Sequence, residues 1–172
     1  MKPSYDLAIN INLSQKCNLR CSYCIATSSQ KRGYIDKARL EITSYLWCSS
    51  RILENFLFRQ NKIFRIDFSG GEPFVCKGFA KMCSRISRNH YIGMMTNNTL
   101  SQTRTFADII DPSRVIFICA SIHFQQLESR GLMTYFIDNF LYFKKKGFNI
   151  SSVGVAHPMF FSNAKKYEEL MR

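Results

Sequence analysis

Short apolar or alternating runs recur along the chain, and longer segments with helical spacing of apolar residues separate them. The runs lie near residues 7 to 13, 63 to 68, 91 to 96, 115 to 122 and 150 to 156, and their length and their β-branched and aromatic content are typical of strands. Regular alternation of strands and helices predicts parallel βαβ units. The pattern therefore predicts an α/β fold with five βα units.

The segments between these runs carry helix signals of their own. Asp111-Pro112-Ser113 is a turn sequence that predicts the end of the third helix before the fourth strand. Lys144-Lys145-Lys146 before Gly147 is typical of a helix C-terminus closed by a glycine. A last helix is predicted from about residue 163 to residue 172. Two apolar helix faces are marked by Ile42, Leu46, Leu53 and Leu57, and by Leu132, Phe136, Phe140 and Phe143.

Length and composition indicate one domain, residues 1–172, in a reducing compartment. The chain of 172 residues is long enough for one substantial core, and no linker divides it. It has seven cysteines, no signal peptide and no long apolar run. These features predict a cytoplasmic protein that does not associate with a membrane. The net charge of +12 would attract polyanions, but the basic residues are scattered, so a solvated basic surface is the preferred interpretation.

The residues suited to chemistry follow the predicted strands. They are the cysteine loop at 17–24 after the first strand, Gly70, Gly71 and Glu72 after the second, Asn97 and Asn98 after the third, Ser121 and His123 at the end of the fourth, and His157 after the fifth. The carboxyl ends of parallel strands share one edge, where α/β sheets and barrels place their sites. We therefore expect a single site at this edge.

Cys17, Cys21 and Cys24 are the most specific feature of the chain. Three thiolates on one loop can hold three irons of an iron-sulfur cluster and leave the fourth iron open to another ligand. Two plainer interpretations remain. The same spacing fits a buried helical stripe, although Ser14, Asn18, Ser22 and the preceding strand favour a loop. Structural zinc would need a fourth close ligand, which the sequence does not offer.

The segment CNLRCSYC, with Tyr23 just before the third cysteine, resembles the cluster loop of the radical S-adenosylmethionine superfamily. Ser69-Gly70-Gly71-Glu72-Pro73 resembles the second motif of that family, at a suitable distance. The resemblance runs from about Ala8 to the last residue. It implies a partial (β/α) barrel of parallel strands with outer helices. Because relatives commonly have six βα units and five are visible, the chain is expected to be truncated or incomplete at its C-terminus.

The resemblance also implies a reaction. Cys17, Cys21 and Cys24 would ligate a [4Fe-4S] cluster whose open iron binds S-adenosylmethionine. An electron donor such as flavodoxin or ferredoxin would reduce the cluster, and cleavage of the cofactor would give methionine and a 5'-deoxyadenosyl radical that abstracts hydrogen from a substrate. The protein would orient these groups and exclude water.

Individual residues receive expected roles from the same resemblance. Gly70, Gly71 and Glu72 would hold the amino group of S-adenosylmethionine, Tyr23 would meet the adenine and shield the cluster, Ser121 would reach the ribose, and Gly154 would lie against the adenine. Three of these features have a plainer alternative: a strand-to-helix turn for the Gly-Gly-Glu segment with Pro73, core filling for Tyr23 and backbone packing for Gly154. Asn97 is a candidate for cofactor binding and His123 for catalysis, although a histidine at a strand end is more often structural.

Asn98 replaces a glycine that many relatives have, and it is expected to adopt positive φ and to cap the following helix. Cys48 and Cys119 are interpreted as packing residues, whereas Cys76 and Cys83 receive no role.

The substrate is open. CNLRCSYC is most similar to relatives that modify peptides or proteins, which favours such a substrate over RNA or a small molecule. The alternatives are an activating enzyme for a glycyl-radical partner, an RNA-modifying enzyme suggested by the positive charge, and a noncatalytic metal-binding relic.

Overall fold

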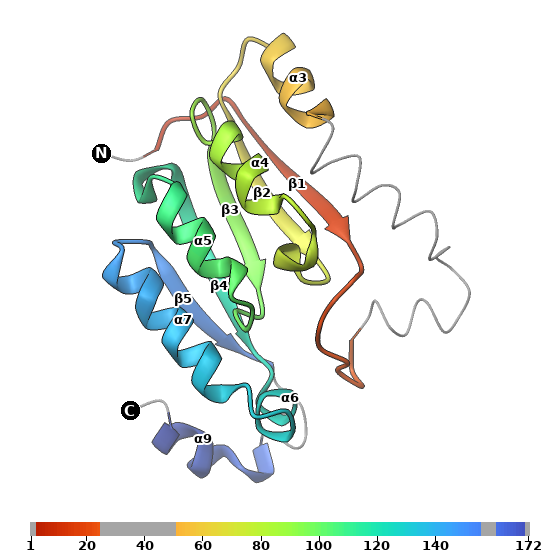
Figure 1. Ribbon diagram of the computed structural model, residues 1–172, viewed down its shortest axis with the longest axis vertical. Coiled ribbons are helices and arrows are strands. Elements are labelled where there is room, and N and C mark those ends of the chain that lie inside the picture. Colours follow the sequence, from red (N-terminus) through yellow and green to blue (C-terminus); the bar gives the residue numbers. More distant parts are fainter. Residues whose placement is uncertain (1–2, 25–50, 156–160, 171–172) are drawn as a thin grey trace, which may run out of the picture.

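The computed structural model describes residues 3–24, 51–155 and 161–170. Its centre is a five-stranded sheet in which neighbouring strands are parallel and follow the order of the sequence (Figure 1). The strands are β1 (Leu7–Ser14), β2 (Phe64–Gly70), β3 (Tyr91–Thr96), β4 (Val115–Ile122) and β5 (Ile150–Gly154). All five predicted strands are confirmed, and the fifth ends two residues earlier than expected.

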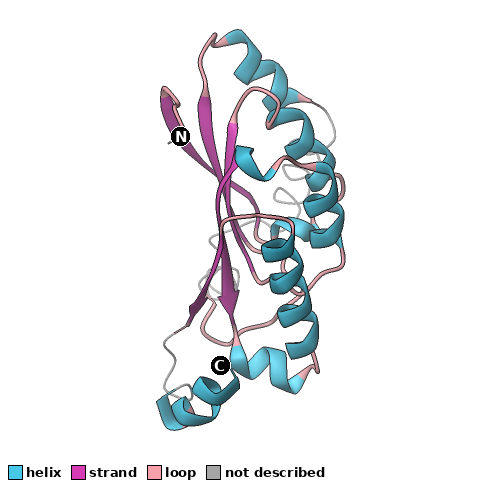
Figure 2. Cartoon of the chain, turned by 90° about the vertical axis from the view of Figure 1, so that its left-hand side faces the viewer, coloured by secondary structure: helices cyan, strands magenta, loops and turns pink. Residues whose placement is uncertain are grey.

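The helices that follow β2, β3 and β4 gather on one face of the sheet, as Figure 2 shows, whereas the C-terminal helix lies past the end of the sheet. In chain order the α-helices are α3 (Ile52–Arg59), α4 (Phe79–Ile86), α5 (Gln102–Ile109), α6 (Phe124–Ser129), α7 (Met133–Lys145) and α9 (Ala164–Leu170). Two short 3₁₀ turns are added by η1 (Pro73–Val75) and η2 (Pro112–Arg114).

Sequential strand order with the helices on one face is the arrangement of a (β/α) barrel. A doubly wound sheet would instead reverse its strand order and cover both faces. The predicted fold class, a partial barrel of parallel strands with outer helices, is therefore confirmed. The carboxyl ends of the five parallel strands lie at one edge of this open barrel, where the sequence placed the candidate residues; His157 lies outside the described residues.

The core lies between the sheet and its helices. Alternate strand residues such as Ile66, Phe68 and Ile118 are fully buried on the helix-covered face. A group of phenylalanine rings with centroids 5.2–6.2 Å apart fills the space beneath the helices: Phe68, Phe74, Phe79, Phe106, Phe143 and Phe148. These buried rings hold the helices against the strands, and so fix the edge where the site lies.

Several local predictions are confirmed within the described residues. Leu53 and Leu57 are buried on α3, and Phe136 and Phe143 are buried on α7. The predicted helix positions Ile42 and Leu46 lie outside the described residues, as does Cys48. Asp111 accepts a hydrogen bond from the Ser113 amide at 2.9 Å, which forms the turn before β4, and Gly147 follows α7 with φ of +85°.

The cysteines outside the loop differ from expectation. Cys119 does not belong to the core cluster and is partly exposed, so its interpretation as a packing residue is wrong. The cause is strand alternation: Ile118 and Ala120 face the helices, and Cys119 faces the opposite side with Ser121. Cys76 and Cys83, which had no assigned role, are buried members of the core.

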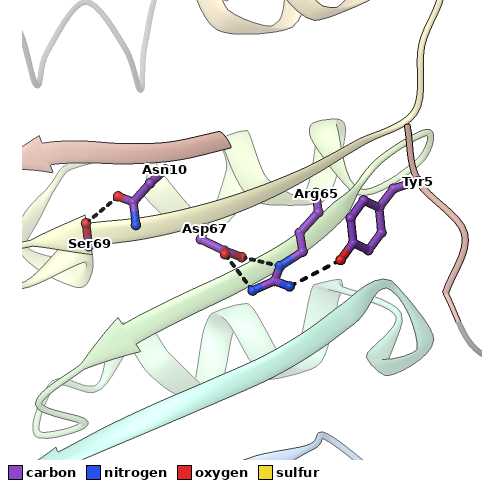
Figure 3. A network of polar contacts seen from close by, with 5 residues as sticks. All are labelled: Tyr5, Asn10, Arg65, Asp67 and Ser69. Atoms are coloured by element: carbon purple, nitrogen blue, oxygen red, sulfur yellow. Dashed lines mark hydrogen bonds and ion pairs between the residues drawn. The ribbon is translucent and has the colours of Figure 1, made fainter. Parts of the chain in front are cut away.

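The face of the sheet opposite the helices is more polar (Figure 3). Arg65 donates to both carboxylate oxygens of Asp67 at 3.0 and 2.7 Å and to the Tyr5 hydroxyl at 3.3 Å. The Phe117 ring lies 5.3 Å from the guanidinium. This cluster requires Gly93, because a Cβ there would lie 2.2 Å from Asp67 Oδ1 and 2.3 Å from the Phe117 ring. Through the hydrogen bond from Arg65 to Tyr5, this cluster holds the N-terminal segment against the sheet.

Among the residues that the structure describes, none of the helices combines the length and the apolar character that crossing a membrane requires.

Candidate active site

The cysteine loop leaves β1 through an irregularity in the sheet. Asn12 pairs with Ser69, but Ser14 pairs with Gly70, so one extra residue lies in β1. Such a bulge redirects the backbone. Beyond it the Ser14 carbonyl accepts a hydrogen bond from the Gly71 amide at 2.6 Å. The Lys16 carbonyl accepts one from the Glu72 amide at 2.8 Å, so the start of the cysteine loop is fastened along the Gly-Gly-Glu segment.

Gly70 and Gly71 permit this close approach. A Cβ on Gly70 would lie 2.4 Å from the Ser14 carbonyl oxygen, and one on Gly71 would lie 2.2 Å from the Lys16 carbonyl oxygen. Gly70 also has φ of +120°, a conformation that favours glycine. The sequence suggested that these glycines leave room for a ligand. In the structure, the space of the missing side chains is taken by the backbone that carries the cysteines, and both glycines still line the neighbouring cavity.

The Glu72 side chain turns away from this cavity and is only 1% exposed. Its carboxylate accepts three hydrogen bonds, from the Phe74 amide at 3.1 Å, the Thr96 hydroxyl at 2.8 Å and the Asn97 amide at 2.6 Å. Burial raises the pKa of this carboxyl to about 7, and the three donors oppose the shift. Glu72 thus joins the end of β2 to the end of β3. Pro73 begins η1, as the plainer interpretation of this segment predicted.

Asn97 connects the end of β3 to the cysteine loop. Its Nδ2 donates to Asn18 Oδ1 at 2.8 Å and approaches Cys17 Sγ at 3.5 Å. Its Oδ1 accepts from the Thr99 hydroxyl at 2.7 Å, and that hydroxyl accepts from Asn18 Nδ2 at 2.9 Å. The Leu19 amide also donates to Cys17 Sγ at 3.4 Å. These bonds orient Cys17 toward the sheet edge.

Asn98 has the positive φ expected of it, +57°, but it does not cap the next helix. Ser101 precedes α5 instead, and no side chain caps that helix. Asn98 Nδ2 donates to the Phe136 carbonyl on α7 at 3.0 Å, and Asn139 Nδ2 returns a bond to the Asn98 carbonyl at 3.0 Å. The expected capping role is therefore wrong: Asn98 is drawn into a buried contact with α7.

The other side of the cysteine loop is held by the end of β4 and by α6. The Tyr23 hydroxyl lies 2.9 Å from His123 Nδ1, and the two rings stack with centroids 5.9 Å apart. The Arg20 amide donates to Gln126 Oε1 at 3.2 Å, and Arg130 donates to the Asn18 carbonyl. Residues 17–24 are therefore supported from two strand ends.

The three cysteine thiols differ in surroundings. Cys17 is exposed, Cys24 is partly exposed and Cys21 is buried. Burial raises the pKa of both the Cys17 and the Cys21 thiols, and hydrogen bonds from Leu19 and Asn97 to Cys17 oppose that shift. No group of three or more His, Cys, Asp or Glu side chains within the described residues is arranged to hold a metal ion.

A cavity of about 830 Å³ opens at this edge of the sheet, a volume within the usual range for small-molecule and cofactor sites. It brings together nine of the sequence-predicted site residues: Cys17, Cys21, Tyr23, Cys24, Gly70, Gly71, Asn97, Ser121 and His123. Two others are not on its wall. Glu72 lies behind it, and at the end of β5 the neighbouring Val155 lines it in place of Gly154.

Sequence reasoning did not single out the other lining residues. They are Gln15, Lys16, Leu19, Arg20, Ser69, Val75, Met95, Thr96 and Val155. Ser69 and Met95 carried a usable signal, because strand alternation places them on the same face as Ser121. Asn18 and Thr99 were also missed; they lie two or fewer residues from predicted site positions, but only the fold brings them together.

The donor set of this cavity suits an iron-sulfur cluster with an exchangeable iron. Among the residues that the structure describes, its wall carries three thiols and no Asp or Glu side chain. The amides of Leu19 and Asn97 already direct hydrogens at a cysteine sulfur, which is the kind of contact that stabilises cluster thiolates.

Comparison with known proteins identifies relatives of this arrangement. The family model for a 4Fe-4S single cluster domain matches residues 10–128. An S-adenosylmethionine-dependent nucleotide dehydratase from Lacinutrix mariniflava is 29% identical over 100 residues, which are 58% of this chain and 20% of the relative. A GTP 3',8-cyclase from Caulobacter vibrioides is 29% identical over 93 residues, 54% of this chain and 24% of the relative. The chain thus spans a quarter or less of the length of these curated relatives.

Solved structures share the fold. Native anSMEcpe with bound AdoMet superimposes with a TM-score of 0.68 at 19% identity, covering 95% of this chain and 48% of the other. The same protein with bound AdoMet and Cp18Cys peptide gives a TM-score of 0.66 at 18% identity, covering 95% and 46%. The cysteine loop and the Gly-Gly-Glu segment fall within the matched family model. This chain is a 4Fe-4S single cluster domain of the radical S-adenosylmethionine superfamily, whose enzymes use a [4Fe-4S] cluster and S-adenosylmethionine.

Proposed function

We propose that Cys17, Cys21 and Cys24 are the three protein ligands of the cluster and that S-adenosylmethionine occupies the adjoining part of the cavity. The observation that carries the proposal is the presence of all three thiols on one wall of a cavity of about 830 Å³, beside the Gly70–Gly71 backbone. The cluster and cofactor supply reductive cleavage of the sulfonium bond, giving methionine and a 5'-deoxyadenosyl radical. The chain binds and orients both groups and shields them from water.

The remaining candidates receive roles from their places around the cavity. The carbonyls of Gly70 and Gly71 accept hydrogen bonds from the cofactor's ammonium group, Ser121 binds the ribose, and Tyr23 covers the cluster. Asn97 orients Cys17 through its amide. Glu72 holds the ends of β2 and β3 in position, and Gly154 sets the path of Val155 next to the adenine. His123, whose Nδ1 lies 2.9 Å from the Tyr23 hydroxyl, is the candidate catalytic side chain.

Cleavage of S-adenosylmethionine tests this function. We expect anaerobically reconstituted protein to bind about four irons, because three thiolates and one exchangeable site suit a cubane cluster. Reduction by dithionite, or by a flavodoxin or ferredoxin, should then release methionine and 5'-deoxyadenosine, measured by chromatography. Stable binding of iron without any product would favour the noncatalytic alternative, and zinc in place of iron would reject the cluster.

The hydrogen bonds of Glu72 give a second expected result. Glu72→Gln replaces one acceptor oxygen with an NH₂ group, which cannot accept from the Phe74, Thr96 or Asn97 donors. We expect the free energy of unfolding of the apoprotein to fall by about 1–3 kcal/mol, the cost of an unsatisfied buried donor. Denaturant unfolding followed by circular dichroism measures it. Unchanged unfolding combined with weaker S-adenosylmethionine binding would instead support direct contact between Glu72 and the cofactor.

Two substrate classes remain in view. A peptide or protein substrate is supported by the CNLRCSYC motif and by the fold shared with a peptide-bound structure. A nucleotide is the second candidate, since both curated relatives are named for nucleotide reactions. One observation favours it: Lys16 and Arg20 line the cavity, and no Asp or Glu of residues 3–24, 51–155 or 161–170 does. Protection of Arg20 and Lys16 from chemical modification by nucleoside triphosphates, but not by cysteine-containing peptides, distinguishes the two.

A further inference from the structure

Asn18, Asn97 and Thr99 form a closed ring of side-chain hydrogen bonds between the cysteine loop and the end of β3. Asn97 Nδ2 donates to Asn18 Oδ1 at 2.8 Å. Asn18 Nδ2 donates to Thr99 Oγ1 at 2.9 Å, and the Thr99 hydroxyl donates to Asn97 Oδ1 at 2.7 Å. We call these three residues the amide triad. Asn18 and Thr99 do not line the cavity, so the cavity alone gives them no role.

One backbone group fixes the orientation of the whole ring. The Thr99 amide donates to Asn97 Oδ1 at 3.2 Å, and a backbone N–H can only donate. The Asn97 atom that faces it must therefore be the oxygen, which places the NH₂ group on the side of Asn18 and Cys17. Asn18 must then accept through its oxygen and present its own NH₂ group to the Thr99 hydroxyl.

The Asn97 NH₂ group has a second hydrogen that the ring does not use. Its nitrogen lies 3.5 Å from Cys17 Sγ, which makes the sulfur the second acceptor. The Asn97 backbone amide donates to Glu72 Oε2 at 2.6 Å, so Asn97 cannot withdraw from the sulfur without breaking a buried bond. Asn97 and Thr99 are only 4% and 5% exposed, so water competes little for these groups. The ring thus directs one N–H at a proposed cluster ligand.

We propose that the amide triad holds the second Nδ2 hydrogen of Asn97 on the Cys17 sulfur and thereby raises the reduction potential of the cluster. Reduction adds one electron, taken from the donor, and an N–H directed at a ligand sulfur stabilises the added negative charge. Asn97 supplies this N–H, and Asn18 and Thr99 are positioning residues that act through it. The inference rests on the ligation of the cluster by Cys17 proposed above.

The reduction potential of the reconstituted cluster tests this role, with dithionite as the electron donor. Asn97→Ala removes the N–H, and we expect reduction to become about 3- to 10-fold less favourable, where 10-fold corresponds to about 59 mV for one electron. Thr99→Val keeps the shape of the side chain but removes the hydroxyl that joins Asn18 to Asn97, so it should lower the potential by a smaller factor. Thr99→Ser restores the hydroxyl and should return the potential to that of the wild type. Titration monitored by electron paramagnetic resonance measures all three.

Thr103→Val is the matched control. Thr103 is 1% exposed, its hydroxyl donates to the Leu100 carbonyl at 2.6 Å, and it lies outside both the cavity wall and the triad. Its potential should equal that of the wild type. An unchanged potential in Asn97→Ala would overturn the hydrogen bond to Cys17. A lowered potential in Asn97→Ala beside an unchanged one in Thr99→Val would overturn the role of the triad, and so would equal shifts in Thr99→Val and Thr103→Val.

A double-mutant cycle on the apoprotein separates this inference from the proposed function. Asn18→Ala and Thr99→Val each break the same ring, so the ratio of folded to unfolded protein should fall less in the double variant than the product of the two single effects. Denaturant unfolding followed by circular dichroism measures this ratio without iron. Single effects that simply multiply would overturn the ring. Failure of the wild type to bind iron would reject ligation by Cys17 and the effect on the potential, whereas the cycle would still decide whether the triad forms.

Discussion

Alanine at Cys17, Cys21 or Cys24 is expected to remove nearly all bound iron and all cleavage of S-adenosylmethionine. The three thiols share one cavity wall, and among the described residues no other cysteine lines it. A cubane held by two thiolates would expose two irons and dissociate readily. Iron and sulfide analysis after anaerobic reconstitution, together with product chromatography, measures the loss for each variant.

Cys119→Ala is the matched control for these variants. Cys119 is partly exposed and lies outside the cavity wall, so its removal takes away a thiol without touching the proposed site. Its iron content should equal that of the wild type. The far-ultraviolet circular dichroism of all four apoproteins should also agree, because none of these side chains belongs to the main hydrophobic core, although Cys21 is buried. Full retention of iron by any of the three loop variants would contradict its assignment as a ligand.

The fold was largely predictable because the strands carry local signals. Alternation within residues 115–122 distinguishes Ile118 and Ala120 from Cys119 and Ser121, and that pattern held in the structure. The same alternation, applied to Cys119 itself, would have placed it away from the core. The interpretation of Cys119 failed because cysteine was treated as a generic apolar residue, although its neighbours already assigned it to the other face.

Side-chain partners were less predictable because they depend on contacts between distant segments. Asn98 kept its positive φ, a local property, but its amide bonds to Phe136, 38 residues away. A capping role could be proposed from sequence alone, whereas this partner could not. Glu72 is similar: the motif resemblance assigned it to the amino group of S-adenosylmethionine, whereas in the structure its carboxylate accepts hydrogen bonds from Thr96 and Asn97 at the end of the next strand.

The sequence predicted many of the residues that line the site, but not the hydrogen bonds between them. The cysteines, Tyr23, Ser121 and His123 were expected at one edge and line one cavity. The hydrogen bonds that join them were not expected, since Tyr23 and His123 are 100 residues apart and their contact depends on where the cysteine loop lies relative to the end of β4.

Gly71→Ala is expected to have the second large effect, and for a reason that the sequence does not reveal. The added Cβ would lie 2.2 Å from the Lys16 carbonyl oxygen and 2.7 Å from the Gln15 carbonyl carbon, both of which are backbone atoms that cannot turn aside. The Gly71 and Glu72 amides would lose their hydrogen bonds to Ser14 and Lys16 as the two segments separate. We expect destabilisation of about 1–3 kcal/mol and, because Cys17 follows Lys16 directly, severe loss of bound iron.

Gly154→Ala serves as the comparison for stability, because its Cβ would meet only the Phe124 ring at 3.8 Å, an ordinary contact. Denaturant unfolding of the apoproteins should therefore separate Gly71→Ala from both Gly154→Ala and the wild type. The iron content of each variant then shows whether the loss of stability also disturbs the cysteine loop. Lower stability together with lost iron means that the Gly-Gly-Glu segment positions the cysteine loop. Wild-type stability and wild-type iron content would mean that the loop does not depend on this close backbone contact. The role of Gly71 would then be limited to binding the cofactor.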